Sequence, residues 1–140
     1  MPALIPESYL PDVHARLILY KRIASATDEE GLKDLQVEMI DRFGLLPEPT
    51  KNLVRITLLK LHAEQLGIKK VDAGPQGGRI EFAADTPVDP LVLIKLIQGQ
   101  PNRYKFEGAT LFKFMVPMER PDERFNTIEA LFERLTPKPS

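Results

Sequence analysis

Apolar residues recur at helical spacing through the first half of the chain and alternate with polar residues through much of the second half. Spacings of three and four residues predict helices over residues 12–26, from residue 27 to about residue 43, and from residue 47 to about residue 66. The first two helices follow each other almost directly, so they are expected to form an antiparallel hairpin. The N-terminal portion is therefore predicted to contain three helices.

The alternating patterns that follow predict two β-hairpins separated by a short helix. The expected elements are strands over residues 68–73 and 79–84, a helix opened by Asp89-Pro90, strands over residues 103–107 and 110–116, and a helix over residues 122–135. The predicted fold class is α+β. The three-helix portion is followed by hairpin–helix–hairpin–helix with a small, mainly antiparallel sheet.

The second helix has the most informative pattern. Thr27 and Glu30 have the spacing of a capping box, and Gly44 stands where a positive-φ residue ends a helix. One face is predicted to be buried, and its apolar residues are Leu32, Leu35, Met39, Ile40 and Phe43.

Acidic residues gather on the opposite face of this helix. They are Glu30, Asp34, Glu38 and Asp41, with Val37 exposed beside them. Like charges three or four residues apart repel by roughly 0.2–0.5 kcal/mol per pair. Lys33 lies off this ridge and Arg42 only flanks it, so no cation is expected to relieve the repulsion. An ordinary solvated face is one interpretation. The other is a docking surface for a cationic partner.

Composition narrows the possible functions. The 19 basic residues nearly cancel the 20 acidic ones, so no global field attracts nucleic acid or an anionic membrane. Cysteine is absent, which excludes disulfides and thiol chemistry and fits a reducing cytoplasm. No apolar run is long enough to cross a membrane.

The sequence also lacks the usual signatures of catalysis. His14 and His62 have no metal-ligand spacing around them, and no phosphate loop or dinucleotide fingerprint is present. We therefore expect no enzyme activity in this chain, with no catalytic residue, no metal site and no cofactor.

The second hairpin leaves an alternative function open. Aromatic Tyr104, Phe106, Phe112 and Phe114 are interleaved with basic Arg103, Lys105 and Lys113. RNA-binding sheets stack bases on residues arranged in this way. The more ordinary interpretation is a core face covered by helices. A nucleic-acid-binding module is thus the alternative, and a hydrolase or transferase with a deep pocket is a further one.

Proline punctuates the first residues of the chain. This pattern predicts that residues 1–11 are a linker from a preceding domain, that residues 12–136 form a single domain, and that residues 137–140 are a tail. The chain is therefore expected to be a domain of a longer protein.

Several short segments resemble the C-terminal domain of bacterial transcription-repair coupling factors. They are Ile-Asp-Arg-Phe-Gly-Leu-Leu-Pro at 40–47, Tyr-Lys-Arg-Ile-Ala-Ser-Ala at 20–26, Gly-Gly-Arg-Ile-Glu-Phe at 77–82, Gln-Pro-Asn-Arg-Tyr at 100–104 and Leu-Phe-Lys-Phe at 111–114. They occur in the family's order and at its spacing. The resemblance covers nearly the whole chain, from Ile5-Pro6 to the last helix.

This resemblance implies a parent protein of the bacterial cytoplasm that acts as a DNA translocase. The parent displaces stalled RNA polymerase, recruits UvrA for nucleotide-excision repair, and uses ATP and magnesium in motor domains outside this chain. The C-terminal domain itself would be non-catalytic and regulatory, and monomeric when isolated.

The resemblance also implies a partner and a contact. The domain would dock on the UvrB-like module of the same protein, mask the UvrA-binding surface and restrain the ATPase motor. The family's acidic pair falls on Glu38 and Asp41. The candidate partner-binding residues are therefore Glu38, Asp41, Asp34, Glu30 and Val37.

Overall fold

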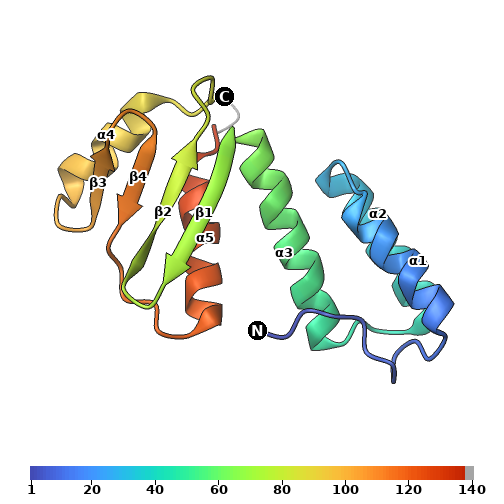
Figure 1. Cartoon of the computed structure of the whole chain (residues 1–140). Helices are drawn as coiled ribbons and strands as arrows, with labels where there is room; N and C mark the ends of the chain where they lie inside the picture. The colour runs from blue at the N-terminus through green and yellow to red at the C-terminus, as the bar shows by residue number, and fades with distance from the viewer. Residues whose placement is uncertain (138–140) are drawn as a thin grey trace. The chain divides into compact units, whose positions relative to one another are not determined.

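The computed structural model describes residues 1–137 (Figure 1). Its elements are α1 (Val13–Ala24), α2 (Glu29–Phe43), α3 (Glu48–Gln65), β1 (Ile68–Gly74), β2 (Gly77–Phe82), α4 (Pro90–Gly99), β3 (Tyr104–Glu107), β4 (Leu111–Phe114) and α5 (Pro121–Leu135). The predicted α+β class is confirmed, as are all the predicted helices and hairpins.

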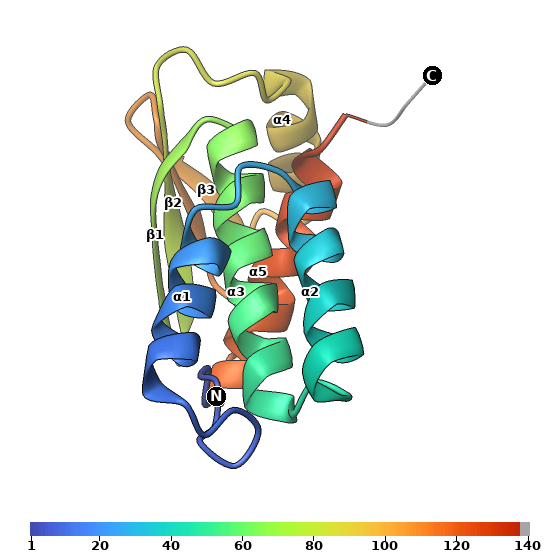
Figure 2. The same cartoon turned by 90° about the vertical axis from the view of Figure 1, so that its right-hand side faces the viewer.

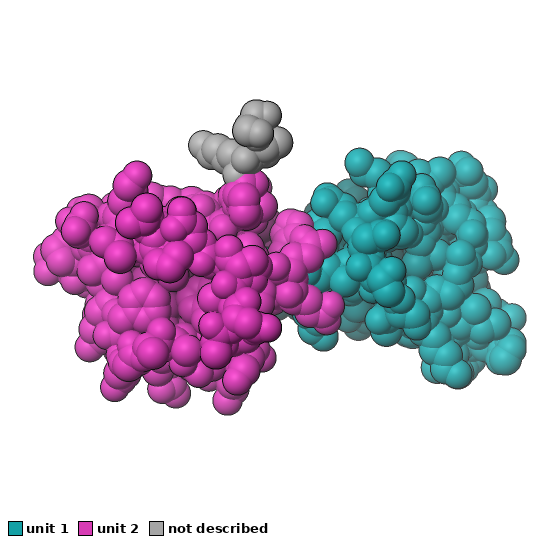
Figure 3. Space-filling view, turned by 90° about the horizontal axis from the view of Figure 1, so that it is seen from above, with its two compact units in different colours: residues 1–61 teal, residues 62–140 magenta. Residues whose placement is uncertain are grey.

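The chain divides into two compact units, residues 1–61 and residues 62–140 (Figure 3). The first contains α1, α2 and most of α3, and the second contains the sheet with α4 and α5. The domain boundaries expected from the sequence stay predictions, and residues 138–140 of the predicted tail lie outside the described part.

The first unit has its own hydrophobic core, and α1 and α2 run in opposite directions as predicted (Figure 2). Each of its helices contributes apolar side chains, and so does the segment that precedes α1. The buried members are Ile5, Leu10, Leu19, Ile23, Leu32, Leu35, Met39, Leu46 and Leu61. The core therefore ties the start of the chain to the helices.

Two apolar positions are exposed although helical spacing places them on buried faces: Leu17, on a predicted stripe with Tyr20 and Ile23, and Ile40. Leu17 faces outward, and Ile40 keeps 38% of its surface exposed. In α2, Ile40 lies about 100° around the helix from Met39, at the edge of the buried arc. In α1, the buried pair is Leu19 and Ile23, so the core stripe is turned away from Leu17.

The segment before α1 is packed rather than loose. The Ile5 N–H donates to the hydroxyl of Tyr20 at 2.7 Å, and the Thr50 hydroxyl donates to the carbonyl of Leu4 at 3.0 Å. Leu10 is buried in the same core. Residues 1–11 thus belong to the first unit, and their role as a linker from a preceding domain stays a prediction.

The ends of α2 are fixed by capping. Asp28, not Thr27, is the N-cap, and its carboxylate accepts from the Gly31 N–H at 2.7 Å. The predicted capping box does not form, because the third helical residue after this N-cap is Gly31, which has no side chain to return the bond. At the other end Gly44 has φ 98° and donates to the carbonyl of Ile40 at 2.9 Å.

The second unit is built on a four-stranded antiparallel sheet with strand order β1-β2-β4-β3. Within this unit α4 and α5 lie on one face of the sheet (Figures 1 and 2). The helices cover inward-pointing side chains, including Ile80 and the aromatic Phe112 and Phe114, which are almost fully buried. Tyr104 is buried as well. The core-face interpretation of the aromatic hairpin is confirmed for Tyr104, Phe112 and Phe114, and Phe106 is half-buried. A base-stacking platform made of these four rings therefore has no support.

We expect Met39→Ala to lower the free energy of unfolding by about 2–5 kcal/mol, since the side chain is fully buried and its removal leaves a cavity. Val37→Ala, on the exposed face of the same helix, is the matched control and is expected to stay within about 0.5 kcal/mol. Urea unfolding of the two variants measures both values. Equal effects would show that the buried face of α2 is assigned wrongly.

Candidate functional site: the acidic face of α2

The outer surface of α2 is defined by residues that point away from the core. Glu30, Asp34 and Asp41 are exposed, and Val37 keeps 55% of its surface exposed. At about 100° per residue, these four side chains fall within an arc of roughly 60° opposite Met39. The packing of the helix therefore presents them together to solvent.

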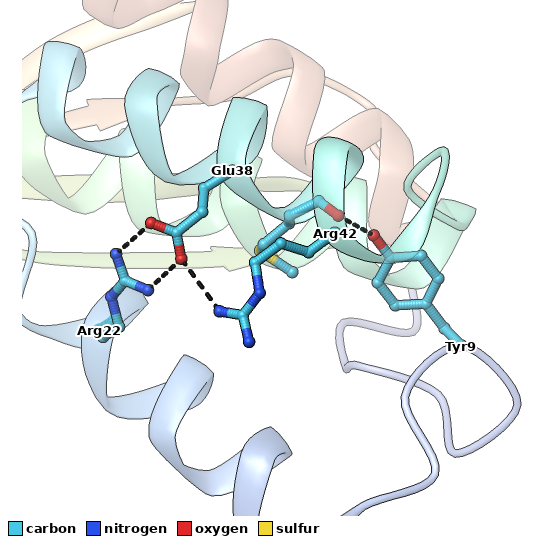
Figure 4. A network of polar contacts seen from close by, with 5 residues as sticks. Tyr9, Arg22, Glu38 and Arg42 are labelled. Atoms are coloured by element: carbon cyan, nitrogen blue, oxygen red, sulfur yellow. Dashed lines mark hydrogen bonds and ion pairs between the residues drawn. The ribbon is translucent and has the colours of Figure 1, made fainter.

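Glu38 lies at the edge of this surface and is already paired (Figure 4). Arg22 of α1 makes a bidentate contact with it, with Nη1 at 2.5 Å from Oε2 and Nη2 at 3.0 Å from Oε1. Arg42 adds a longer contact from its Nη1 to Oε2 at 3.4 Å. The expectation that no cation relieves the acids is therefore wrong for Glu38.

The position of Glu38 around the helix explains this correction. It lies about 60° from Leu35, on the flank where α2 meets α1, whereas Asp41 lies on the outermost line. Arg42 is four residues after Glu38, the spacing at which an acid followed by a base pairs favourably. Arg22 comes from another helix, so the pattern of α2 alone gives no sign of it.

The pairing has an electrostatic consequence for both partners. The hydrogen bonds from Arg22 hold the pKa of the Glu38 carboxyl below its usual value, and Arg42 adds to the same effect. The Glu38 carboxylate in turn raises the pKa of Arg22. Glu38 is therefore ionised at neutral pH, but its charge is compensated within the first unit.

The other carboxylates of the face remain available. Within residues 1–137, the side chains of Glu30, Asp34 and Asp41 make no ion pair or hydrogen bond. Four carboxylates and the two guanidinium groups of Arg22 and Arg42 leave an excess of two negative charges (4 − 2). The face can therefore still attract a cationic partner.

Apolar surface lies beside these charges. Leu45, in the turn after α2, is 84% exposed, and Ile40 adds to the patch. The turn is held by the Tyr9 hydroxyl, which donates to the carbonyl of Gly44 at 2.8 Å (Figure 4 shows its bond to the carbonyl of Met39). Sequence reasoning missed Leu45, because a hydrophobic residue after a helix-ending glycine commonly packs against the last turn of the helix.

Two observations on the described residues bear on the catalytic alternatives. In residues 1–137, no group of three or more His, Cys, Asp or Glu side chains is placed to hold a metal ion. A pocket of about 510 Å³ lies among Phe82, Val88, Leu93 and Phe106, and its lining has no titratable side chain. A hydrolase or transferase site thus has no support there. No helix in the same residues is long and apolar enough to cross a membrane.

Comparisons of the sequence with known proteins all match the same protein family. Residues 1–93 match the model of the TRCF domain. The chain is 54% identical over 115 residues to the transcription-repair-coupling factor of Haemophilus influenzae, covering 82% of this chain and 10% of that protein. It is 43% identical over 135 residues to that of Escherichia coli K12, covering 96% of this chain and 12% of that protein.

The fold is matched by a solved structure as well. The crystal structure of a C-terminal domain of transcription-repair coupling factor superposes with a TM-score of 0.75 at 22% identity, over 96% of this chain and 87% of that one. The chain spans only about a tenth of the length of its full-length relatives.

We expect Arg22→Gln to raise the pKa of the Glu38 carboxyl toward its ordinary value, because the first cause of its depression is the bond from Arg22. Lys21→Gln removes a neighbouring charge without breaking that bond and should leave the titration nearly unchanged. NMR titration of the glutamate side-chain carboxyls measures the shift. An unaltered Glu38 curve in Arg22→Gln would show that the pair does not persist in solution.

Proposed function

Because the chain belongs to the transcription-repair-coupling factor family, we propose that it is a non-catalytic regulatory domain of such a factor. In the bacterial cytoplasm, the outer face of α2 docks on the UvrB-like module of the same protein. The observation that carries this proposal is the exposed column of Glu30, Asp34 and Asp41, which has no cationic partner within residues 1–137.

Docking inhibits by competition for a basic surface. UvrA binds the UvrB-like module through basic side chains there, and an acidic helix placed over them excludes UvrA. Carboxylates recognise arginine through charge-assisted bonds, but each exposed pair contributes little to affinity. The two partners lie on one chain, so a high effective concentration keeps the weak contact closed.

Opening then follows as a shift of population. The closed form restrains the ATPase motor as well as masking the UvrA site. A ligand that binds the open form better, such as RNA polymerase engaged by the parent protein, draws the equilibrium toward it. A contact made of several weak pairs suits this task, because it opens without a large penalty.

The two members of the acidic pair, Glu38 and Asp41, differ in how available their carboxylates are to a partner. A carboxylate has about four lone-pair positions, and Arg22 already uses both oxygens of Glu38 while Arg42 shares one. A cation of the partner must displace these arginines or share Glu38 with them. Asp41 has no such competitor in the described residues, so it is the principal docking residue.

In the full-length factor, Asp41→Asn is expected to raise UvrA binding and basal ATPase activity, each by up to about fivefold, the range for one exposed charge contact. Glu38→Ala together with Asp41→Ala should raise both further, while Glu38→Gln alone should have the smaller effect. UvrA affinity by biolayer interferometry and ATP turnover without polymerase measure the outcome.

Glu64→Gln, an exposed charge change on α3, is the matched control for these variants. It should leave UvrA binding and ATPase activity at wild-type levels. If the double variant also behaves as wild type in both assays, with an unchanged melting temperature, the acidic face is not the docking surface.

Arg22→Gln should act in the opposite direction to Asp41→Asn. Removing the internal competitor frees Glu38 for the partner, so the closed form is favoured and UvrA binding falls below that of the wild-type factor. Lys21→Gln, one residue away on the exposed side of α1, controls for net charge. Increased UvrA binding by Arg22→Gln would instead mean that Arg22 holds Glu38 in its docking position.

A further inference from the structure

We propose that the face of the sheet turned away from α4 and α5 binds the phosphate backbone of a nucleic acid, without regard to base sequence. This surface lies in the second unit and does not involve the acidic face of α2. Its defining feature is a row of three cations on adjacent strands, Arg79, Lys113 and Lys105, here called the basic row.

The register of the sheet aligns the basic row. Arg79 on β2 is directly opposite Lys113 on β4, and Lys113 is directly opposite Lys105 on β3. Neighbouring strands are about 4.8 Å apart, so the row extends over about 10 Å. The next residues along the strands, including Ile80 and Phe112, point into the core. Alternation therefore directs all three cations to the uncovered face.

The charges of all three cations act on one carboxylate, that of Glu107. Glu107 forms an ion pair with Lys113, and its pKa is lowered first by Lys113 and then by the charges of Lys105 and Arg79. Like charges placed directly opposite each other on a sheet are destabilising. Asp72 on β1 also stands directly opposite Arg79. With these two carboxylates the row keeps one positive charge in excess (3 − 2), and an added anion would relieve the repulsion between Lys113 and Lys105.

The rest of the face does not cancel this excess. Glu81 accepts a hydrogen bond from the Thr110 hydroxyl at 2.9 Å, and Lys70 pairs with Asp72 at 3.7 Å on the outer strand β1. Arg103, exposed just before β3, adds a further cation. Over the whole face, five cations oppose three carboxylates, an excess of two (5 − 3).

A hollow next to the basic row gives a bound strand room to approach. It has a volume of about 410 Å³, and its lining includes Gly77, Gly78, Arg79 and Lys113. Gly77 has φ 144°, and a Cβ there would lie 2.1 Å from the carbonyl oxygen of Phe114, so no side chain fits. The backbone of Phe114 therefore approaches Gly77 closely, and neither glycine places a side chain in the hollow beside Arg79 and Lys113.

The chemistry of the face favours phosphate over an acidic protein. Protein interfaces depend on a buried apolar centre with aromatic anchors. The aromatic rings of this sheet point to the side covered by the helices. Among β1–β4, their turns and the residue that follows β4, Met115 is the one large apolar side chain that is exposed. Phosphate contacts need only cations. Because no ring is available for stacking, binding is independent of sequence and of strandedness.

The test uses the 140-residue chain and a fluorescein-labelled DNA duplex of arbitrary sequence, followed by fluorescence anisotropy from low to physiological salt. Three phosphate contacts predict a slope of log K against log salt near −2.7. Arg79→Gln with Lys105→Gln should reduce the slope by about two and the low-salt affinity by more than about tenfold. Lys51→Gln with Lys95→Gln makes the same charge change elsewhere and should bind as wild type.

A variant that binds the duplex more tightly is a useful test, because loss of the fold would weaken binding rather than strengthen it. Glu107→Gln removes the carboxylate shared by the row and should tighten duplex binding about two- to fivefold. A single-stranded oligonucleotide should bind with a similar slope. Thermal unfolding of each variant checks that the fold is retained, and the single variant Lys105→Gln replaces the double variant if the latter unfolds.

Several results would overturn the proposal. They are no binding by the wild-type chain at low salt, an equal loss in the control double variant, or no tightening by Glu107→Gln. Tighter binding of a poly-glutamate peptide than of the duplex would identify an acidic protein as the occupant instead. Loss of duplex binding in the row variants, with tightening by Glu107→Gln, supports the nucleic-acid backbone.

Discussion

The burial of one side of α2 is the constraint on which the proposed regulation depends. Met39 is fully buried, with Leu32 and Leu35 beside it in the core of the first unit. Because this contact sets the rotation of the helix, it also decides which side chains face water. The acids at 30, 34 and 41 are presented as a group only while the opposite side remains packed. The packing that stabilises the core therefore also determines which side chains form the proposed docking surface.

Much of this could be predicted from the sequence, because helical spacing is a local signal. The period of α2 places Asp41 outermost and Met39 innermost without any knowledge of the neighbouring helices. The partner of Glu38 could not be predicted in the same way. Arg22 lies 16 residues earlier, and its contact with Glu38 depends on how the two helices are rotated about their axes when their apolar faces meet. Ile40 was placed inside because it lies near the edge of the buried arc of α2. Leu17 was placed inside because the local pattern does not show the rotation of α1 that turns Leu19 and Ile23 inward.

In the sheet as well, features set by neighbouring residues could be predicted, and features set by the pairing of distant strands could not. Alternation along β3 and β4 correctly places Tyr104, Phe112 and Phe114 in the core. The basic row was not predicted, because it requires Arg79 of the first hairpin to stand opposite Lys113 of the second. That register comes from the pairing of β2 with β4, whose paired residues are 30 or more positions apart in the sequence, such as Arg79 and Lys113 at 34. The sequence singled out Lys105 and Lys113 only within the second hairpin, as part of the nucleic-acid-binding alternative, and without Arg79.

Because charges are grouped by cross-strand pairing, the net charge of the chain is a poor guide to what one surface attracts. A formal charge of −1 led to the expectation that no global field draws in nucleic acid. At physiological salt, however, a charge is felt over only about 8 Å, which is less than the length of the basic row. A phosphate at the row therefore responds to Arg79, Lys105 and Lys113 and to the nearby carboxylates of Glu107 and Asp72, rather than to the total. On α2, Glu38 lies three residues from Asp41 and within this distance, but its charge is compensated by Arg22, so the carboxylate of Asp41 is the one left to act on a partner. In both units the relevant quantity is the charge left uncompensated within one screening length, and that quantity is set by cross-strand and cross-helix pairing.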